Sequence, residues 1–238
     1  MNSAWHQRGF SLIELAVALF VIALLLGSVL VPLATQVEQR QINETQRSMD
    51  EIREALLGFA AANGYLPCPA ISATDGQEDR TAGVCTGGKR QGYLPWEALG
   101  ASKIDTWGRL YRYSVTPAFT TAASFTLTTS PDMLIRTRNN AGALANLTNA
   151  NIVVAALISH GKNGYGGVDA NGTAVALPAS WSTANVDESS NLTSATTFVS
   201  RVQQAAGASG TGGVFDDQLV WLSRYTLTNR LVTAGKLP

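Results

Sequence analysis

Histidine and cysteine are scarce in this chain of 238 residues, which contains two of each. Two cysteines without a nearby histidine make half of a typical zinc ligand set. One histidine, His6, lies among the first ten residues, and the other, His160, follows Ser159 without the Gly-x-Ser-x-Gly sequence of a nucleophile elbow. A single histidine with no acid–nucleophile set is typical of a structural residue, so we expect no enzyme activity.

A net charge is also absent, because 17 basic residues balance 17 acidic ones. Proteins that bind nucleic acid usually have an excess of basic residues or a basic face. Here the candidates for such a face are scattered along the second half of the chain, so we expect no nucleic-acid partner. These candidates are Arg136, Arg138, Lys162, Arg224 and Arg230.

The segment GVCTGGKR, residues 83–90, comes close to the sequence of a phosphate-binding loop. Such a loop needs Ser or Thr after its lysine to reach magnesium, and here Arg90 follows Lys89. No strand is predicted to lead into this segment, and Cys85 would tether it. We therefore reject a nucleotide site.

Charge is missing altogether from Leu15 to Ala34. A membrane-spanning helix needs about 20 apolar residues, whereas the apolar part of a cleaved secretory signal has about 7–15. The run therefore predicts a transmembrane anchor helix over residues 10–34. A plain signal-anchor explains everything except Glu14 at its entrance, where a charge costs less than at the helix centre because it can reach the interface.

The sequence around this glutamate, GFSLIE at residues 9–14, resembles the N-terminus of type IV pilins and type II secretion pseudopilins. In that family a short basic leader ends in glycine and is removed by a membrane-embedded prepilin peptidase. The new N-terminal phenylalanine is N-methylated, and the fifth mature residue is a glutamate. The resemblance implies a cleaved leader over residues 1–9, a cut between Gly9 and Phe10, N-methylation of Phe10, and Glu14 as an assembly residue.

Charge pairing in lipid explains why such a family would keep a glutamate at the position of Glu14. Cleavage would create a charged amine on Phe10, and an amine or a carboxylate that is costly alone in lipid becomes tolerable when paired. In a filament, the amine of one subunit can meet Glu14 of a neighbour. Because Arg8 should keep the leader cytoplasmic, we expect a single-pass protein of the bacterial inner membrane with its head in the periplasm.

In an exported domain, the two cysteines, Cys68 and Cys85, would most often form a disulfide. A bridge closing a loop of this size contributes roughly 3 kcal/mol in chain-entropy models. Two unpaired buried thiols remain the alternative.

Residues 35–63 predict an amphipathic continuation of the anchor helix, with Gly64 as its stop. Small or apolar residues recur there at alternating spacings of three and four. They are Ile42, Thr45, Met49, Ile52, Leu56, Phe59 and Asn63.

Residues 64–238 predict a globular α+β head, an antiparallel sheet packed on the apolar face of the long helix, as in pilins. Alternating patterns predict strands at residues 109–115 and 124–129, and the apolar run at 151–161 predicts a central strand. Residues 218–232 predict a strand or a short helix.

Two features of the head extend the resemblance. DTWGRLYRY, residues 105–113, resembles a segment of the major pseudopilin, and LISHGKNG and FDDQLVW resemble other pieces of pseudopilin heads. Since major pseudopilins carry calcium in a head loop, calcium is the one cofactor that we consider, with Asp169 and Asn171 as weak ligand candidates. An Asn-Gly turn capped by Asp169 explains these two residues better. Asp216-Asp217 could be a cap or a pair of oxygen ligands.

The function that this resemblance implies is structural. We expect a subunit of a type II secretion-like pseudopilus, processed by prepilin peptidase and assembled with other pilin-like subunits on an inner-membrane platform with its ATPase. A minor type IV pilin for pilus assembly, adhesion, motility or DNA uptake is the alternative.

Overall fold

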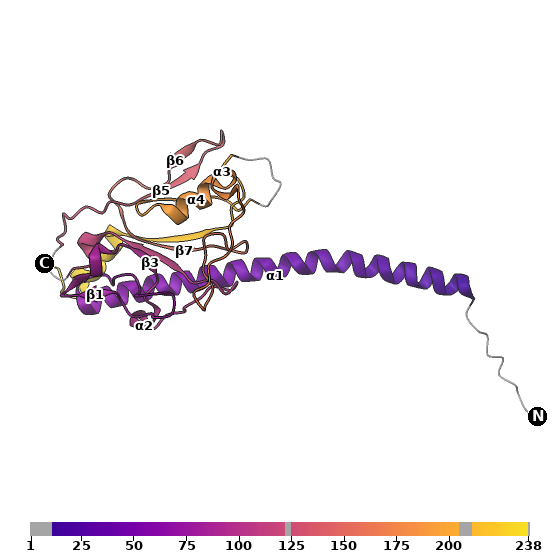
Figure 1. Cartoon of the computed structure of the whole chain (residues 1–238), viewed down its shortest axis with the longest axis horizontal. Helices are drawn as coiled ribbons and strands as arrows, with labels where there is room; N and C mark the ends of the chain where they lie inside the picture. Colours follow the sequence, from indigo (N-terminus) through magenta and orange to yellow (C-terminus); the bar gives the residue numbers. More distant parts are fainter. Residues whose placement is uncertain (1–10, 122–124, 205–210, 238) are drawn as a thin grey trace, which may run out of the picture. The chain divides into compact units, whose positions relative to one another are not determined.

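The computed structural model describes residues 11–121, 125–204 and 211–237, with the side chains of all of these except residues 26–32. It contains two units, Met1–Asn43 and Glu44–Pro238. The helices are α1 (Leu12–Asn63), α2 (Trp96–Leu99), α3 (Trp181–Ala184), α4 (Val186–Thr193) and α5 (Arg224–Thr233), with short 3-10 turns at Thr86–Gly88 and Pro117–Phe119 (Figure 1). The strands are β1 (Arg80–Thr81), β2 (Val84–Cys85), β3 (Gln91–Tyr93), β4 (Arg112–Val115), β5 (Leu134–Arg138), β6 (Leu144–Asn146), β7 (Val153–Ser159), β8 (Thr197–Val199) and β9 (Gln218–Ser223).

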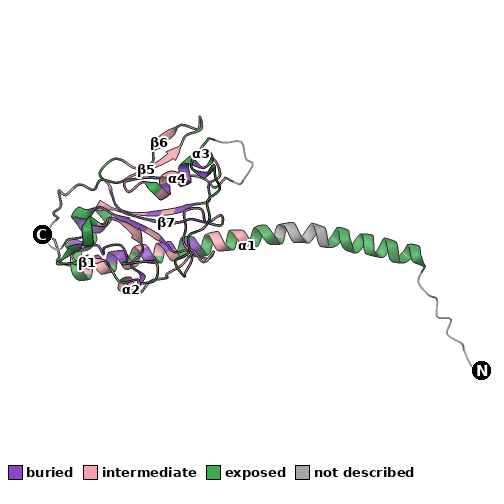
Figure 2. Ribbon diagram, viewed as in Figure 1, coloured by how far each residue is buried: buried purple, intermediate pink, exposed green. Residues whose placement is uncertain are grey.

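Helix α1 begins at Leu12 and ends at Asn63. Gly64 takes a positive φ of 83° and its N–H donates to the carbonyl of Ala60, which closes the last turn. In the first unit, every side chain from Ser11 to Leu25 is exposed (Figure 2). Among the residues that the structure describes, no helix has the length and apolar character that crossing a membrane requires.

In the second unit, α1 buries the predicted face as far as Leu56 and then departs from it. Burial passes to Leu57 and Ala60, whereas Phe59 is only half-buried and Asn63 is exposed. The predicted spacing averages 3.5 residues and an α-helix has 3.6 per turn, so the pattern drifts by about 20° every seven residues. The sequence prediction is therefore wrong about which side of the last turns of α1 is buried.

A four-stranded antiparallel sheet in the order β3-β4-β7-β9 packs on this face of α1. The prediction of a central strand is confirmed by β7, in which every residue is buried. The segment predicted as strand or short helix is both, because β9 runs directly into α5. Ser223 caps that helix by accepting the N–H of Tyr225.

A second sheet, in the order β6-β5-β8, lies on the side of the first sheet away from the C-terminal half of α1 (Figure 1). Its strands β5 and β8 are parallel, which the sequence prediction of an antiparallel head did not include. Between these two strands the chain passes through β6, β7, α3 and α4, a crossover of the kind that a parallel pair requires.

The strand predicted at residues 124–129 is wrong for the part that the structure describes, since residues 125–129 contain no strand. Thr126 instead begins a tight turn, in which its N–H donates to Oγ1 of Thr129 and its carbonyl accepts the N–H of Thr129. Threonine hydroxyls that bond to nearby backbone offer the chain an alternative to a strand ladder.

Two hydrophobic cores lie on opposite faces of the four-stranded sheet. Val154 and Leu157 of β7 face the core shared with α1, whereas Ala156 and Ile158 face a second core formed with Ile135 and Phe198. Strand β9 alternates in the same way, with Leu219 and Trp221 packing on the second core. The sheet is therefore covered on both faces.

The second core provides a test of this layering. Phe198 is fully buried, and we expect Phe198→Ala to lower the free energy of unfolding by about 3–5 kcal/mol because it leaves a cavity. Urea denaturation of the full chain in detergent, followed by tryptophan fluorescence, measures the change. Val202→Ala is the control, since Val202 is 87% exposed and should change the stability by less than about 0.5 kcal/mol.

Candidate functional site

The predicted processing site, Gly9 and Phe10, lies outside the described residues. The predicted assembly residue Glu14 lies in the first turn of α1 and is exposed. Its Oε2 accepts the backbone N–H of Ser11 at 2.9 Å, and its own N–H donates to Ser11 Oγ at 3.3 Å. Glu14 therefore has a local partner within its own helix.

The two cysteines form the predicted disulfide, Cys68–Cys85, with Cα atoms 5.4 Å apart. Both residues are buried. The bridge joins β2 to the chain that follows α1, and the N–H of Cys68 also donates to Oε2 of Glu78. Within the loop that it closes, Ala70 is buried in the core shared with α1, and Arg80 Nη1 donates to the carbonyl of Thr120.

The lysine of the GVCTGGKR segment supports this loop. Lys89 Nζ donates to the carbonyls of Ala70 and Ile71 at 2.6 and 3.1 Å and pairs with Asp79 at 2.9 Å. The pairing with Lys89 lowers the pKa of the Asp79 carboxyl. The ammonium group is thus held by oxygen atoms of the protein.

The DTWG segment is a turn tied to the end of β7. Oδ1 of Asp105 accepts the N–H groups of Trp107 and Arg109, both at 2.9 Å, and Oδ2 accepts the Ser159 hydroxyl at 2.6 Å. Gly108 has φ 77°, which favours glycine at this position. Burial raises the pKa of Asp105, although these hydrogen bonds oppose the rise. The segment is a structural link between the loop and the central strand.

A buried polar cluster lies where β7 ends. His160 Nδ1 is 3.2 Å from Oδ1 of Asp217, and Oδ2 of Asp217 accepts the amide of Asn191 at 2.8 Å. His160, Asn191 and Asp217 are all buried. The imidazole Nε2 has no hydrogen-bond partner among the described residues. His160 therefore lies in a buried network with a carboxylate and an amide.

Two further carboxylates complete this cluster. Asn163 donates its side-chain amide to Glu188 at 2.9 Å and its backbone N–H to Asp216 at 2.7 Å. Glu188 Oε1 also accepts the N–H of Asp216 at 3.0 Å. Glu188, Asp216 and Asp217 each contribute one carboxylate oxygen, and these three atoms lie within 4.8 Å of one another. We call these three residues the acidic cluster.

The acidic cluster is electrostatically unfavourable when fully ionised. Burial, together with the charges of Glu188 and Asp217, raises the pKa of Asp216 to about 8. Burial and the charge of Asp217 also raise the pKa of Glu188. Asp216 Oδ1 has no hydrogen-bond partner among the described residues. Carboxylate oxygens so arranged hold either a proton or a hard cation such as calcium.

The weak calcium candidates from the sequence lie elsewhere, in a turn. Oδ1 of Asp169 accepts the N–H groups of Asn171 and Thr173 at 2.9 and 2.8 Å, and Gly172 has φ 91°. The same hydrogen bonds lower the pKa of Asp169. Asn171 is exposed. This geometry is that of an Asn-Gly turn capped by an aspartate.

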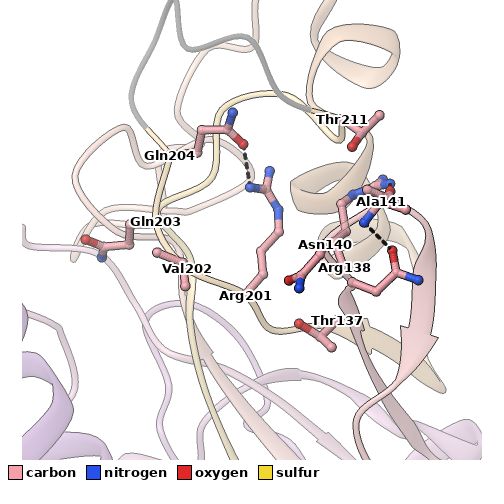
Figure 3. Close-up of a pocket in the computed structure, with 11 residues that line it drawn as sticks. Thr137, Arg138, Asn140, Ala141, Arg201, Val202, Gln203, Gln204 and Thr211 are labelled. Carbon is pink, nitrogen blue, oxygen red and sulfur yellow. Dashed lines mark hydrogen bonds between the residues drawn. The ribbon is translucent and has the colours of Figure 1, made fainter.

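A polar cavity of about 580 Å³ lies beside β5. Arg138 and Arg201 lie in it, and both donate to the buried carboxylate of Asp187 at 2.7 Å. Figure 3 shows Arg201 also bonded to Gln204. Since the described carboxylates, amides and carbonyls engage these guanidinium groups, we interpret the two arginines as anchors of α4.

The other basic residues considered as a nucleic-acid face also have partners. Arg230 pairs with Glu54 at 3.0 Å, and Arg224 donates to the carbonyl of Thr129. Arg136 donates to the carbonyl of Leu144.

Comparison with known protein families gives a match at the N-terminus. Residues 6–30 match the prokaryotic N-terminal methylation motif. This is the prepilin-type motif of type IV pilin-like proteins, so the resemblance noted in the sequence is confirmed. The motif implies processing by prepilin peptidase and assembly with other pilin subunits. No curated protein and no solved structure matches the chain.

Sequence reasoning found part of the acidic cluster and missed the rest. From the sequence, Asp216-Asp217 could be a cap or a pair of oxygen ligands, and nothing there associates Glu188, Asn163 or Asn191 with this pair. Glu188 lies 28 residues before Asp216, on the short helix α4. The local sequence of α4 does not reveal its buried side, because Asp187, Glu188 and Asn191 lie there in place of the usual apolar residues.

The raised pKa of Asp216 predicts a pH dependence of stability in the presence of a chelator. An Asp with a pKa of about 8 when folded and about 3.9 when unfolded keeps its proton preferentially in the folded state. Its contribution is therefore fully present below about pH 4 and is lost as the pH rises towards 8. We expect the free energy of unfolding to fall between pH 5 and 8 by at most about 1.4 kcal/mol per pH unit for this proton.

Denaturant unfolding at pH 5, 6, 7 and 8 measures this slope. Asp216→Asn should flatten it, because the amide has no proton to release. Asp169→Asn is the control and should leave it unchanged, since the lowered pKa of Asp169 puts its titration below this range. Equal slopes for the wild type and Asp216→Asn would contradict the prediction.

Proposed function

We propose that the protein is a structural subunit of a type II secretion-like pseudopilus. It is inserted in the bacterial inner membrane, cut between Gly9 and Phe10, methylated on Phe10, and assembled into a periplasmic filament that drives protein export. The observation that carries this proposal is the prepilin-type motif at residues 6–30. An assembly platform and its ATPase would supply the energy, and the chain itself would be no enzyme.

The N-terminal half of α1 supports a membrane anchor over residues 10–34. Large apolar side chains are exposed there on all sides of the helix, including Leu12 at 89%, Ile13 at 73% and Phe20 at 66%. Exposed apolar surface of this extent needs lipid or other subunits to cover it. The anchor helices would form the filament core and the heads its surface.

The DTWG segment supports the choice of a pseudopilus over a type IV pilus. It resembles a segment of the major pseudopilin. Within it, Asp105 accepts the hydroxyl of Ser159 at the end of β7. A minor type IV pilin remains the alternative. The two differ in their partners, which are the proteins of a secretion machine in one case and of a pilus in the other.

Mass spectrometry of the mature N-terminus tests the processing. In cells that contain prepilin peptidase, we expect the purified protein to begin with N-methylated Phe10. A protein that begins with Met1, or with another residue, would contradict the proposal. Gly9→Leu is a matched variant, which should leave the leader attached while the anchor stays intact.

Deletion of the gene for this protein tests whether it belongs to a secretion machine or to a pilus. In a strain with both a secretion machine and pili, loss of the protein should block export of a secreted enzyme and leave pilus number and twitching unchanged. The reverse result would assign it to the pilus. Re-expression of the wild-type chain, but not of Gly9→Leu, should restore export.

We also propose that the head binds calcium, at the acidic cluster of Glu188, Asp216 and Asp217. Calcium prefers carboxylate and carbonyl oxygens. Three carboxylates converge here, and Asp216 Oδ1 lacks a partner among the described residues. Among the described residues, the Asp169 turn belongs to no comparable group of three carboxylates.

Thermal unfolding at pH 7.5 tests the calcium proposal. Millimolar calcium should raise the Tm of the wild type, because a ligand that binds only the folded state stabilises it. Asp216→Asn and Glu188→Gln should abolish the rise, and Asp169→Asn should keep it. Loss of the rise in Asp169→Asn alone would place the ion at the turn, and no rise in the wild type would refute calcium binding.

A further inference from the structure

The first turn of α1 is closed by two reciprocal hydrogen bonds between Ser11 and Glu14. The Ser11 N–H donates to Glu14 Oε2, and the Glu14 N–H donates to Ser11 Oγ. The carbonyl of Ser11 accepts the N–H of Leu15 at 3.1 Å, so that the helix begins directly after it. Ser-x-x-Glu in this geometry is a capping box, which satisfies two backbone donors that a helix start otherwise leaves without partners.

This capping box involves the same carboxylate that the proposed filament needs. In the uncut chain the α-amine of Phe10 does not exist, because Phe10 is still bonded to Gly9. A carboxylate near lipid without a partner is costly, and the Ser11 N–H gives Glu14 a hydrogen-bond donor at this stage. The unprocessed chain therefore does not have to carry Glu14 without a hydrogen bond.

We propose that Ser11 is a positioning residue for Glu14. It holds the carboxylate in a capping box until the Phe10 amine of a neighbouring subunit replaces the Ser11 N–H. This inference rests on the proposed function, which supplies the amine, and adds the partner that Glu14 has before assembly. The exchange breaks and makes hydrogen bonds only.

The geometry of Glu14 allows such an exchange. The Ser11 N–H donates to Oε2 of the carboxylate, which leaves Oε1 outside this hydrogen bond. The side chain is exposed. An incoming amine can therefore meet Oε1 first, while Ser11 still holds Oε2, and the carboxylate keeps a donor throughout.

Substitutions separate the two roles of Glu14. Glu14→Gln keeps an oxygen that can accept the Ser11 N–H, since Gln also occurs in capping boxes, but it loses the charge that attracts an amine. Ser11→Ala keeps the charge and removes the hydroxyl that caps Glu14. Ser11→Thr keeps a capping hydroxyl and is the conservative control.

Amide hydrogen exchange measures the box directly. The full-length, uncut chain is made in cells without prepilin peptidase and placed in lipid bicelles. Ser11→Ala should raise the exchange rate of the Glu14 amide about fivefold, the usual effect of losing a serine cap, and Ser11→Thr should leave it as in the wild type. An unchanged rate in Ser11→Ala would refute the box.

Assembly in cells measures the exchange of partners. We expect Glu14→Gln to be cut and methylated but absent from cross-linked filaments. Ser11→Ala should be cut and should assemble as well as the wild type, whereas its uncut form, in cells without the peptidase, should be degraded faster. Ser11→Thr should restore the wild-type lifetime.

Two results of this second experiment would overturn the proposal. If Ser11→Ala fails to assemble as Glu14→Gln does, then Ser11 acts in the filament and not before it. If the uncut Ser11→Ala chain persists as long as the wild type, then the box does not support the precursor.

Failure of the proposed function would look different. A wild-type chain that is never cut after Gly9 would remove the amine and with it the exchange. Hydrogen exchange on the uncut chain would still decide whether the Ser11 hydroxyl caps the Glu14 amide.

Discussion

The burial of strand β7 on both faces is the constraint on which the head depends. Each of its residues is buried, and its alternating side chains supply two cores, one shared with α1 and one with the second sheet. Such a strand has to be apolar throughout and needs a cover on each side. The four-stranded sheet, the helix face from Thr45 to Ala60 and the second sheet all take their positions from this requirement.

The same strand also decides where polar groups gather. Where β7 ends, the chain has to leave the interior; Ser159 and His160 are polar and buried there, and Asn163 is half-buried. Ser159 binds Asp105, His160 binds Asp217, and Asn163 binds Glu188 and Asp216. Buried polar groups need partners, so three distant segments, the DTWG turn, helix α4 and the start of β9, converge on one point. The acidic cluster is a product of this convergence.

The N-terminal unit, taken by itself, has a different pattern of exposure. The first turns of α1 expose apolar side chains on every side and keep one charged residue, Glu14, at the start. A charged group in such surroundings is tolerable only with a partner, and the chain provides one locally through Ser11. Residues 6–30, which include this turn, match the prepilin-type motif of type IV pilin-like proteins, and this motif implies assembly with other pilin subunits. The same carboxylate therefore has one partner in the isolated chain and another in the filament that we propose.

The sequence by itself determined the features that depend on neighbouring residues. The motif around Glu14, the helix stop at Gly64, the central strand and the pairing of the two cysteines could all be predicted, because local spacing or a restricted choice of partners defines them. The last buried turns of α1 and the turn at Thr126 were mispredicted for local reasons, which are the drift of a 3.5-residue pattern on a 3.6-residue helix and the threonine hydroxyls that bond to nearby backbone. The parallel pair β5–β8 could not be predicted, since tertiary packing decides it. Glu188 could not be joined to Asp216 and Asp217 for the same reason. Only the folded head, with β7 buried on both faces, brings a residue of α4 to the start of β9.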